Sequence, residues 1–416
     1  MISVEQHLGR ILDTVRRLPP IELGLLDALG CVLAEDVRSA ADLPGFTNSA
    51  MDGYAVHAAD VAAATAESPA LLPVVNDIAA GNTQALSLAP RQSMRIMTGA
   101  PLPHGADAVV PVELTDAGLA AVAVRSPVEV GQHVRPTGDD VRTGELVLRS
   151  GGRLGPRQLA LLAAVGRSSV RVVPKPRVVV VSTGDELVEV GRPAGFGQVV
   201  DSNGLMLTAA VRALGAVPFR VGPVVDDAKE LLATLEDQLV RADAVITTGG
   251  VSAGAYDTVK EVLSRVGTVR FDKVSMQPGM PQGFGVLGAD ETPVFTLPGN
   301  PVSAMVSFEV FVAPALRAMA GRPEHESALV PAVVETGWTT PAGKTQFARA
   351  VLHPRRITGT NGQDCDFAVT LVGAQGSHVL GGLAAANCLA VIPAAVTEVQ
   401  AGDVVRCHLL GAMMEA

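Results

Sequence analysis

Four short segments rich in glycine, serine, threonine and asparagine could bind an anion. Each follows a predicted strand, and in an open parallel sheet ligands bind where strands end and loops lead into helices. Glycines allow backbone N–H groups to approach a phosphate or another oxyanion closely. None of the four is a G-x-G-x-x-G or Walker sequence, so dinucleotide binding and NTP hydrolysis are not favoured. The segments are Ser182-Thr-Gly-Asp-Glu186, Gly222-Pro223 before Asp226-Asp227, Thr247-Thr-Gly-Gly-Val-Ser-Ala-Gly254 and Pro298-Gly-Asn-Pro301.

Three carboxylates, Glu186, Asp226 and Asp257, fall at the same predicted edge of the sheet. Carboxylates repel a phosphate unless a hard cation lies between them. The group therefore predicts Mg²⁺ bridging acid oxygens and phosphate oxygens. Asp226 and Asp257 also have a local explanation, because either could cap the helix that follows it. The residues alone leave both roles open.

Two further segments combine turn formers with polar side chains. Residues 47–55 contain Asp52 in an Asp-Gly sequence, and residues 95–101 are a predicted strand that runs into a turn at Thr98. Taken singly, each favours a structural role, Asp52 in a tight turn and Thr98 bonding within its own turn. The eight histidines occur in no H-E-x-x-H or Ser-His-Asp context, so hydrolysis by an activated serine is not favoured.

The elements that must position the anion-binding segments lie in residues 174–324, where strands and helices alternate. The valine run at 177–182 suits a strand buried on both faces. The alternation implies right-handed crossovers and a doubly wound, mostly parallel α/β sheet with helices on both faces. Strands are predicted over 177–182, 216–221, 244–248, 269–274 and 294–297, and helices over 203–214, 227–239, 257–266 and 302–320.

The rest of the chain has different patterns of apolar and turn-forming residues. A helix begins near Val4 and ends before Pro19-Pro20, and a second is predicted over 22–29, ending at Gly30. Residues 46–138 alternate short apolar runs with turn clusters, which predicts a β-rich module. Pro156 opens a helix predicted over 155–164. The last region, 325–416, is predicted to be a small β domain with strands at 328–334, 347–352, 367–372, 389–392 and 404–409.

Length and composition limit the class of protein. At about 150 residues per domain, the 416 residues suggest roughly three domains. A net charge of −10 and only 13 aromatic residues (10 Phe, 2 Tyr, 1 Trp) argue against nucleic acid and anionic membranes as partners. The four cysteines follow no zinc spacing and are expected to be buried thiols. Neither a signal peptide nor an apolar run of membrane-spanning length is recognised, so a cytoplasmic protein is expected.

Five motifs, in order along the chain, resemble those of the molybdopterin molybdenumtransferases, the MoeA and gephyrin E-domain family. The resemblance extends from about residue 3 to residue 410. The motifs are Ser49-Ala-Met-Asp-Gly-Tyr-Ala55, Met97-Thr-Gly-Ala-Pro101, Ser182-Thr-Gly-Asp-Glu-Leu187, Gly249-Gly-Val-Ser252 and Leu297-Pro-Gly-Asn-Pro-Val-Ser303.

The resemblance implies an elongated homodimer of four-domain subunits. Residues 1–45 and 139–173 would form a discontinuous N-terminal dimerisation domain, and 46–138 a β-rich inserted domain. Residues 174–324 would be a MogA-like α/β domain that binds molybdopterin, and 325–416 a C-terminal β domain. Asp52 and Thr98 would come from the partner subunit and help to complete the cleft.

The implied reaction joins molybdate to the dithiolene of adenylylated molybdopterin and releases AMP, with Mg²⁺ or another divalent cation assisting. The implied catalytic residues are Asp52, Thr98, Asp140, Glu186, Asp226 and Asp257, of which Glu186, Asp226 and Asp257 would hold the metal. The implied residues for molybdate and substrate are Lys273, Arg349, Ser377, Ser252, Gly249, Gly250, Pro298, Gly299 and Asn300.

One loop departs from the family pattern. Where the family commonly has Lys-Pro-Gly-Lys-Pro, this chain has Gln277-Pro-Gly-Met-Pro281. Gln277 can donate hydrogen bonds to an oxyanion, but neither Gln277 nor Met280 supplies Coulomb attraction. We expect one of three consequences of this change: weaker oxyanion binding, a compensating cation elsewhere in the chain, or an altered task.

The sequence is also compatible with two alternatives to a molybdenum insertase. The chain could be a molybdopterin adenylyltransferase, although that smaller enzyme lacks the regions corresponding to 1–173 and 325–416. It could also be a non-catalytic molybdopterin-binding scaffold. Besides a second copy of the chain, an adenylyltransferase or downstream proteins of molybdoenzyme maturation are the expected partners.

Overall fold

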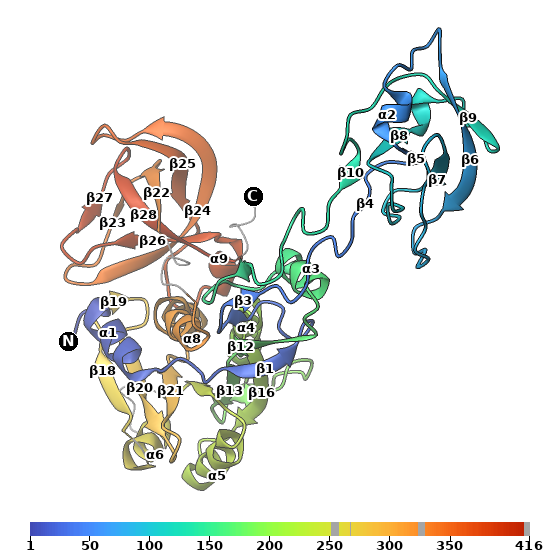
Figure 1. Cartoon of the computed structure of the whole chain (residues 1–416). Coiled ribbons are helices and arrows are strands. Elements are labelled where there is room, and N and C mark those ends of the chain that lie inside the picture. The colour runs from blue at the N-terminus through green and yellow to red at the C-terminus, as the bar shows by residue number, and fades with distance from the viewer. Residues whose placement is uncertain (251–257, 267, 323–328, 412–416) are drawn as a thin grey trace. The chain divides into compact units, whose positions relative to one another are not determined.

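The computed structural model describes residues 1–250, 258–266, 268–322 and 329–411 (Figure 1). The chain forms two compact units. The large unit comprises residues 1–21, 30–32 and 173–416, and the small unit comprises 22–29 and 33–172. The four domain ranges expected from the sequence stay a prediction, and the expected range 1–45 is divided between the two units.

A six-stranded sheet forms the centre of the large unit. The first four strands in its spatial order are parallel, and the fifth, β20, pairs antiparallel with the strand on each side of it. The predicted doubly wound, mostly parallel sheet is therefore confirmed. The order is β16 (Val217–Val224), β13 (Arg177–Thr183), β17 (Ala244–Thr248), β21 (Thr292–Leu297), β20 (Pro281–Leu287) and β18 (Arg270–Lys273).

Helices cover both faces of this sheet, and the valines of β13 show how. Val178 and Val180 pack on one side with α1, α4 and the long helix that follows β21. Val179 and Val181 pack on the other side with α5 and α6. Alternate residues of a strand point to opposite faces, so a continuous valine run supplies both cores. The helices are α1 (Val4–Thr14), α4 (Ser202–Ala213), α5 (Ala228–Leu239) and α6 (Thr258–Val266).

Strand β20 was not predicted from the sequence. Its Gly283 and Gly285 resemble turn residues in a linear sequence, but in the sheet they make room for neighbouring chain segments. A Cβ atom on Gly285 would lie 2.5 Å from the Cα of Val269. These glycines therefore allow close packing of the antiparallel edge, a requirement that a strand pattern does not reveal.

The predicted helix over 302–320 is confirmed as one continuous element with a π-helical centre. It runs through α7 (Pro301–Ser307), the π turn η2 (Phe308–Val312) and α8 (Ala313–Met319). Pro314 has no N–H to donate, and the N–H of Ala313 bonds to the carbonyl of Phe308. By length and hydropathy, residues 301–319 could cross a membrane, but 67% of the most apolar window is buried within the protein. This is a core helix.

The C-terminal part of the large unit is a closed β barrel. Strand β26 pairs with both β28 and β24, which closes the ring β24-β25-β22-β28-β26. The predicted β domain is confirmed. The strands are β22 (Val330–Val334), β24 (Thr345–Thr358), β25 (Asp364–Leu371), β26 (Cys388–Ile392) and β28 (Val404–Leu409), with the short β19 (Met276–Gln277), β23 (Trp338–Thr339), β27 (Glu398–Val399) and helix α9 (Leu380–Ala385) beside them. All four cysteine side chains are buried and none forms a disulfide, as expected.

The small unit contains a five-stranded sheet, which confirms the β-rich module. Its order is β8 (Ala108–Pro111), β5 (Gly53–Val56), β7 (Ser93–Ile96), β6 (Ala70–Ile78) and β9 (Ala121–Val124). Two strand pairs carry the chain into and out of this module, β3 (Val37–Arg38) with β11 (Leu146–Leu148) and β4 (Asn48–Ser49) with β10 (Val134–Arg135). The remaining elements are α2 (Ala58–Val61), η1 (Val112–Leu114), α3 (Pro156–Ala164), which begins at Pro156 as predicted, and β12 (Ser169–Val173).

The helix predicted over 22–29 is wrong. Residues 21–24 form strand β1 (Ile21–Gly24), and residues 25–30 form a turn before β2 (Val32–Leu33). Gly24 lies within the expected helix, where glycine costs about 1 kcal/mol, and so short a segment offers little helical cooperativity in return. Gly30 does adopt the expected left-handed conformation (φ 79°), but it ends a turn.

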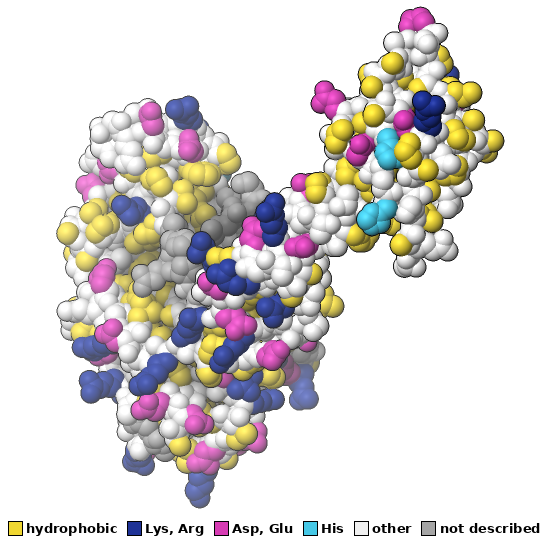
Figure 2. Space-filling view, viewed as in Figure 1, with side chains coloured by type: hydrophobic (Ala, Val, Ile, Leu, Met, Phe, Trp, Pro, Cys, Tyr) yellow, Lys and Arg dark blue, Asp and Glu magenta, His cyan; other side chains and the backbone are white. Residues whose placement is uncertain are grey.

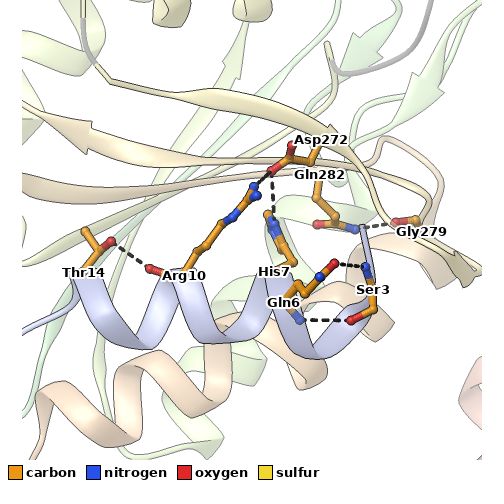
Figure 3. A network of polar contacts seen from close by, with 8 residues as sticks. All are labelled: Ser3, Gln6, His7, Arg10, Thr14, Asp272, Gly279 and Gln282. Atoms are coloured by element: carbon orange, nitrogen blue, oxygen red, sulfur yellow. Dashed lines mark hydrogen bonds and ion pairs between the residues drawn. The ribbon is translucent and has the colours of Figure 1, made fainter. Parts of the chain in front are cut away.

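Helix α1 is anchored to strand β18 of the central sheet (Figure 3). Ser3 and Gln6 form a reciprocal capping box at its first turn. Arg10 Nη1 donates to Asp272 Oδ2 at 3.1 Å, and His7 Nδ1 lies 3.6 Å from the same oxygen. The backbone of Ile2 bonds to Lys273 and Ser275, so the N-terminus holds the segment that follows β18.

Candidate functional site

A cavity of about 580 Å³ lies at the carboxyl ends of β13, β17 and β21. This is the edge at which the sequence predicted an anion site. Two short parallel strands beside it, β14 (Leu187–Val188) and β15 (Val199–Val200), contribute further apolar wall. Five predicted site residues line the cavity: Glu186, Gly249, Pro298, Gly299 and Asn300.

The loops after β17 and β21 meet at the cavity floor. Gly249 donates its N–H to the carbonyl of Leu297 at 3.3 Å. Gly250 follows with a positive φ of 64° and does not itself line the cavity. The remaining predicted residues of this loop, Ser252 and Asp257, lie outside the described residues.

Asp226 does not cap helix α5. The capping residue is Asp227, whose carboxylate accepts from the N–H groups of Lys229 and Glu230 at 2.9 and 3.0 Å. The local explanation for Asp226 is therefore wrong. Asp226 instead faces other acids, and its N–H donates to Asp185 Oδ1 at 2.9 Å.

The acids at this edge affect one another electrostatically. Partial burial raises the pKa of Asp226, and the negative charges of Asp185 and Glu186 raise it further. Gathered like charges of this kind suit a divalent cation with a preference for oxygen ligands. Within the described ranges, however, no three His, Cys, Asp or Glu side chains converge closely enough to hold a metal ion.

A buried polar network in the cavity wall was not predicted from the sequence. Asn203 Nδ2 donates to Thr248 Oγ1 at 3.0 Å and to the carbonyl of Gly299 at 2.7 Å. Asp201 caps α4 and pairs with Arg220 at 2.8 Å. In the sequence, Asp201-Ser-Asn203 at the start of the predicted helix resembles an ordinary N-terminal cap. This motif therefore indicated a structural role only.

Asn300 and Ser377, both predicted site residues, contact each other. Asn300 Nδ2 donates to Ser377 Oγ at 3.0 Å, and the N–H of Val302 donates to the carbonyl of Ser377 at 3.2 Å. The loop after β21 is thus joined to the C-terminal barrel at the cavity rim. The two residues are 77 positions apart in the sequence, so their contact could not be predicted from it.

Arg349 is only 1% exposed and does not present its guanidinium to solvent. Its Nη1 donates to the carbonyl of Gly376 at 2.9 Å, and its Nη2 donates to the carbonyl of Ala374. Burial lowers the pKa of Arg349. In this structure Arg349 supports the loop that carries Ser377.

Lys273 and Gln277 lie near the cavity but outside its lining. Lys273 is exposed at the end of β18, in register with Pro281, which does line the cavity. Gln277 is exposed on β19 and precedes a cis peptide bond to Pro278. A long side chain at either position extends from the hairpin that leads to the cavity wall.

Three predicted catalytic residues, Asp52, Thr98 and Asp140, belong to the small unit. Asp52 and Thr98 are brought together, because Asp52 Oδ1 accepts from both the N–H and the hydroxyl of Thr98. The expectation that Thr98 bonds only within its own turn is therefore wrong. Asp140 is exposed, and its N–H donates to the carbonyl of Leu43 at 2.9 Å.

Three family models match successive parts of the chain. Residues 2–166 match the MoeA N-terminal region (domain I and II), residues 179–318 a probable molybdopterin binding domain, and residues 331–410 the MoeA C-terminal region (domain IV). The matches follow the order of the β-rich, α/β and barrel regions described above.

Proteins similar over nearly their whole length are named molybdopterin molybdenumtransferase or molybdopterin biosynthesis MoeA protein. Molybdopterin molybdenumtransferase 2 of Mycobacterium tuberculosis H37Rv is 46% identical over 97% of this chain and 98% of its own. Molybdopterin molybdenumtransferase of Bacillus subtilis is 34% identical over 98% of this chain and 94% of its own. A crystal structure of the molybdopterin biosynthesis MoeA protein from Pyrococcus horikoshii is 30% identical, with a TM-score of 0.78 over 98% of this chain and 99% of its own.

Proposed function

Because the chain belongs to the molybdopterin molybdenumtransferase family, we propose that it inserts molybdate into adenylylated molybdopterin and releases AMP. It is a transferase of molybdenum cofactor biosynthesis. The observation that supports the proposed reaction is the cavity, where Glu186, Gly299 and Asn300 lie together at the carboxyl ends of parallel strands. Such an edge suits a phosphate-bearing ligand.

An anionic substrate must be held by local groups, because the chain as a whole has a net charge of −10. Figure 2 shows Lys and Arg side chains interspersed with Asp and Glu over the visible face of the large unit, without a single basic field. Lys273 is the exposed cation of the predicted set in the large unit. The amide of Asn300 and the hydroxyl of Ser377 add neutral donors at the rim.

A divalent cation such as Mg²⁺ is part of this proposal. Partial burial and the nearby charges of Asp185 and Glu186 raise the pKa of Asp226, which fits a cation-binding edge. Glu186 and Asp226 would hold the ion with Asp257, which lies outside the described residues. When bound, the ion would neutralise charge on the phosphate and on the acids. Asp257→Asn tests this role, because Asn caps a helix as well as Asp but is a poorer ligand for a hard cation.

We also propose a cytoplasmic homodimer in which Asp52, Thr98 and Asp140 of one copy serve the cavity of the other. Mixing Asp52→Asn and Glu186→Gln variants, each inactive alone, should restore up to about one quarter of the activity if subunits exchange randomly, because one cavity in such a mixed dimer has every residue intact. If mixed dimers form but activity is not restored, the result would contradict a site shared between subunits. An adenylyltransferase and later maturation proteins are proposed partners.

Incubation with adenylylated molybdopterin, Mg²⁺ and molybdate tests the main reaction. Molybdate-dependent release of AMP is the expected result. Release of pyrophosphate from ATP and plain molybdopterin would instead indicate an adenylyltransferase. Binding of the pterin without turnover would contradict the proposal and indicate a scaffold.

A further inference from the structure

One side of the cavity is formed by residues 186–200, here called the flap. Its first arm contains β14 and its second arm contains β15. The N–H of Val199 donates to the carbonyl of Glu186 at 2.9 Å, and the N–H of Asp201 donates to the carbonyl of Val188 at the same distance. Two strands of two residues each cannot hold such a segment in place by themselves. The side chains of the flap that line the cavity are Glu186, Leu187, Val199 and Val200.

Arg220, on the edge strand β16, contacts the chain at the end of each arm. Its Nη1 lies 2.5 Å from Oε1 of Glu189, which follows β14. Its Nη2 lies 2.8 Å from Oδ2 of Asp201, which follows β15. The planar guanidinium has enough donors to serve two carboxylates at once, and both bonds are charge-assisted. One side chain therefore joins both arms of the flap to the central sheet.

The two ion pairs of Arg220 differ in burial. The side chain of Asp201 is 1% exposed, whereas that of Glu189 is 39% exposed. An exposed ion pair usually contributes little, because two long side chains must be ordered to form it. Here the buried pair with Asp201 already fixes the guanidinium, so only Glu189 has to be ordered. We therefore expect the outer pair to contribute near the upper end of the range for surface ion pairs.

Two glycines make room for these ion pairs. A Cβ atom on Gly204 would lie 2.3 Å from Asp201 Oδ2 and 3.1 Å from Arg220 Nε, so a side chain at this position would displace the inner pair. A Cβ atom on Gly222 would lie 3.5 Å from Glu189 Oε2, which places the Glu189 carboxylate against the backbone of β16. The flap is therefore fitted to the sheet at both contacts.

We propose that Arg220 and Glu189 are positioning residues that hold the flap, and with it the carboxylate of Glu186, against the cavity. Neither Arg220 nor Glu189 lines the cavity, so both act on a bound ligand through the flap. This inference rests on the proposed function, in which Glu186 would hold a divalent cation beside a phosphate.

Two variants remove the outer ion pair in different ways. Glu189→Ala leaves Arg220 bound to Asp201. Arg220→Lys keeps a positive charge for the buried Asp201, but one ammonium cannot reproduce a fork that serves two carboxylates. The two variants should therefore weaken the flap equally, and combining them should add nothing. Glu335→Ala is the matched control, because Glu335 Oε1 lies 2.7 Å from Arg355 Nη1 in an ion pair of the C-terminal barrel.

Hydrogen exchange at the backbone amides of Val199 and Asp201 measures how often the flap opens. In both flap variants these two amides should exchange about three- to fivefold faster, the range expected for loss of a favourable surface ion pair. The amides of β13 should exchange at the parental rate, and Glu335→Ala should leave the flap amides unchanged. Parental exchange at Val199 and Asp201 in the flap variants would overturn the inference.

Ligand binding tests whether the flap positions the site. If the cavity binds its ligand with the flap closed, a larger open fraction lowers the apparent affinity, and saturating ligand restores the closed state. Both flap variants should therefore weaken AMP binding in calorimetric titration, and raise KM for adenylylated molybdopterin, by about two- to fivefold. Their kcat should stay within about twofold of the parental value, and Glu335→Ala should change none of these quantities. Faster exchange with parental AMP affinity and KM would overturn the positioning role.

The same measurements separate this inference from the proposed function. Molybdate-dependent AMP release with parental KM and parental AMP affinity in both flap variants would overturn the inference and leave the function intact. Faster flap exchange and weaker AMP binding in a chain that never releases AMP would support the inference and contradict the function.

Discussion

Thr98 donates two hydrogen bonds to one carboxylate oxygen of Asp52, from its backbone N–H at 2.7 Å and from its hydroxyl at 2.8 Å. Both bonds favour the ionised carboxylate, so they lower the pKa of Asp52, the backbone bond having the larger effect. Asp52 therefore stays negatively charged at neutral pH. Asp52 and Thr98 therefore form one hydrogen-bonded unit with a fixed negative charge.

Thr98→Val should raise the pKa of Asp52 part of the way back to its ordinary value. The variant loses the hydroxyl bond and keeps the stronger backbone bond, so the rise is incomplete. Carboxyl chemical shifts of Asp52 followed by NMR across the acidic pH range measure this directly. An unchanged titration of Asp52 would show that the hydroxyl bond has no electrostatic effect.

His7 should make the stability of the large unit depend on pH. Burial lowers the pKa of His7 below its ordinary value of 6.5, although Asp272 opposes this and Arg10 reinforces it. The unfolded chain therefore binds a proton first as pH falls through 6.5, and stability declines below that pH by up to about 1.4 kcal/mol per pH unit. Melting curves at pH 7 and pH 5 should differ more in the parent chain than in His7→Gln. Parallel profiles would contradict this.

Asp226→Asn should stabilise the fold and impair the reaction. The pKa of Asp226 is raised by burial and by Asp185 and Glu186, so its ionised form is disfavoured in the folded state above the ordinary pKa of 3.8. Removing the charge should raise Tm slightly at pH 7. The gain should disappear as pH falls towards 3.8, and AMP release should fall at least tenfold.

Asp227→Asn is the matched control for Asp226→Asn. Asp227 caps α5, and Asn is an equally good cap, so both Tm and AMP release should stay near parental values. Equal losses of activity in the two variants would mean that Asp226 has no special role at this edge.

The central sheet and its helices could be predicted because their sequence signals are local. The valines of 177–182 indicate a strand buried on both faces, and Leu231 and Leu235 repeat at helical spacing. Strand β20 could not be predicted in the same way, because Gly285 is required by the nearby backbone of Val269. A contact between segments leaves no periodic pattern in either one.

The candidate site also contains residues whose position could be predicted from the sequence and residues whose role could not. Glu186 and Asn300 follow predicted strands, and their cavity position could be predicted from the topology of a parallel sheet. The roles of Asp226 and Asp227 could not be separated, because capping depends on which carboxylate faces the first helical N–H groups. Asn203 was missed for a related reason, since its partners come from loops after two other strands.

Gln277→Lys tests whether the hairpin after β18 faces the oxyanion. Gln277 and Lys273 are both exposed, so the variant would add a second cation in a solvent-accessible position. A gain of at most about 1 kcal/mol, or about fivefold in the molybdate Kd, is expected at low ionic strength. The gain should shrink at high salt because solvent ions screen it. Equal affinity of parent and variant at both salt concentrations would place Gln277 away from the ion.

Arg349→Lys should lower stability as well as activity. The planar guanidinium donates to two carbonyls of the loop that carries Ser377, and one lysine ammonium cannot reproduce that fork. Leaving the half-buried carbonyl of Gly376 without a donor costs about 1 kcal/mol, which corresponds to a fall in Tm of about 3 °C. Ser377→Ala, which loses only the bond from Asn300, should raise KM with little change in Tm. An Arg349→Lys variant with a parental Tm and a raised KM would mean that Arg349 acts on the substrate directly and does not support the loop.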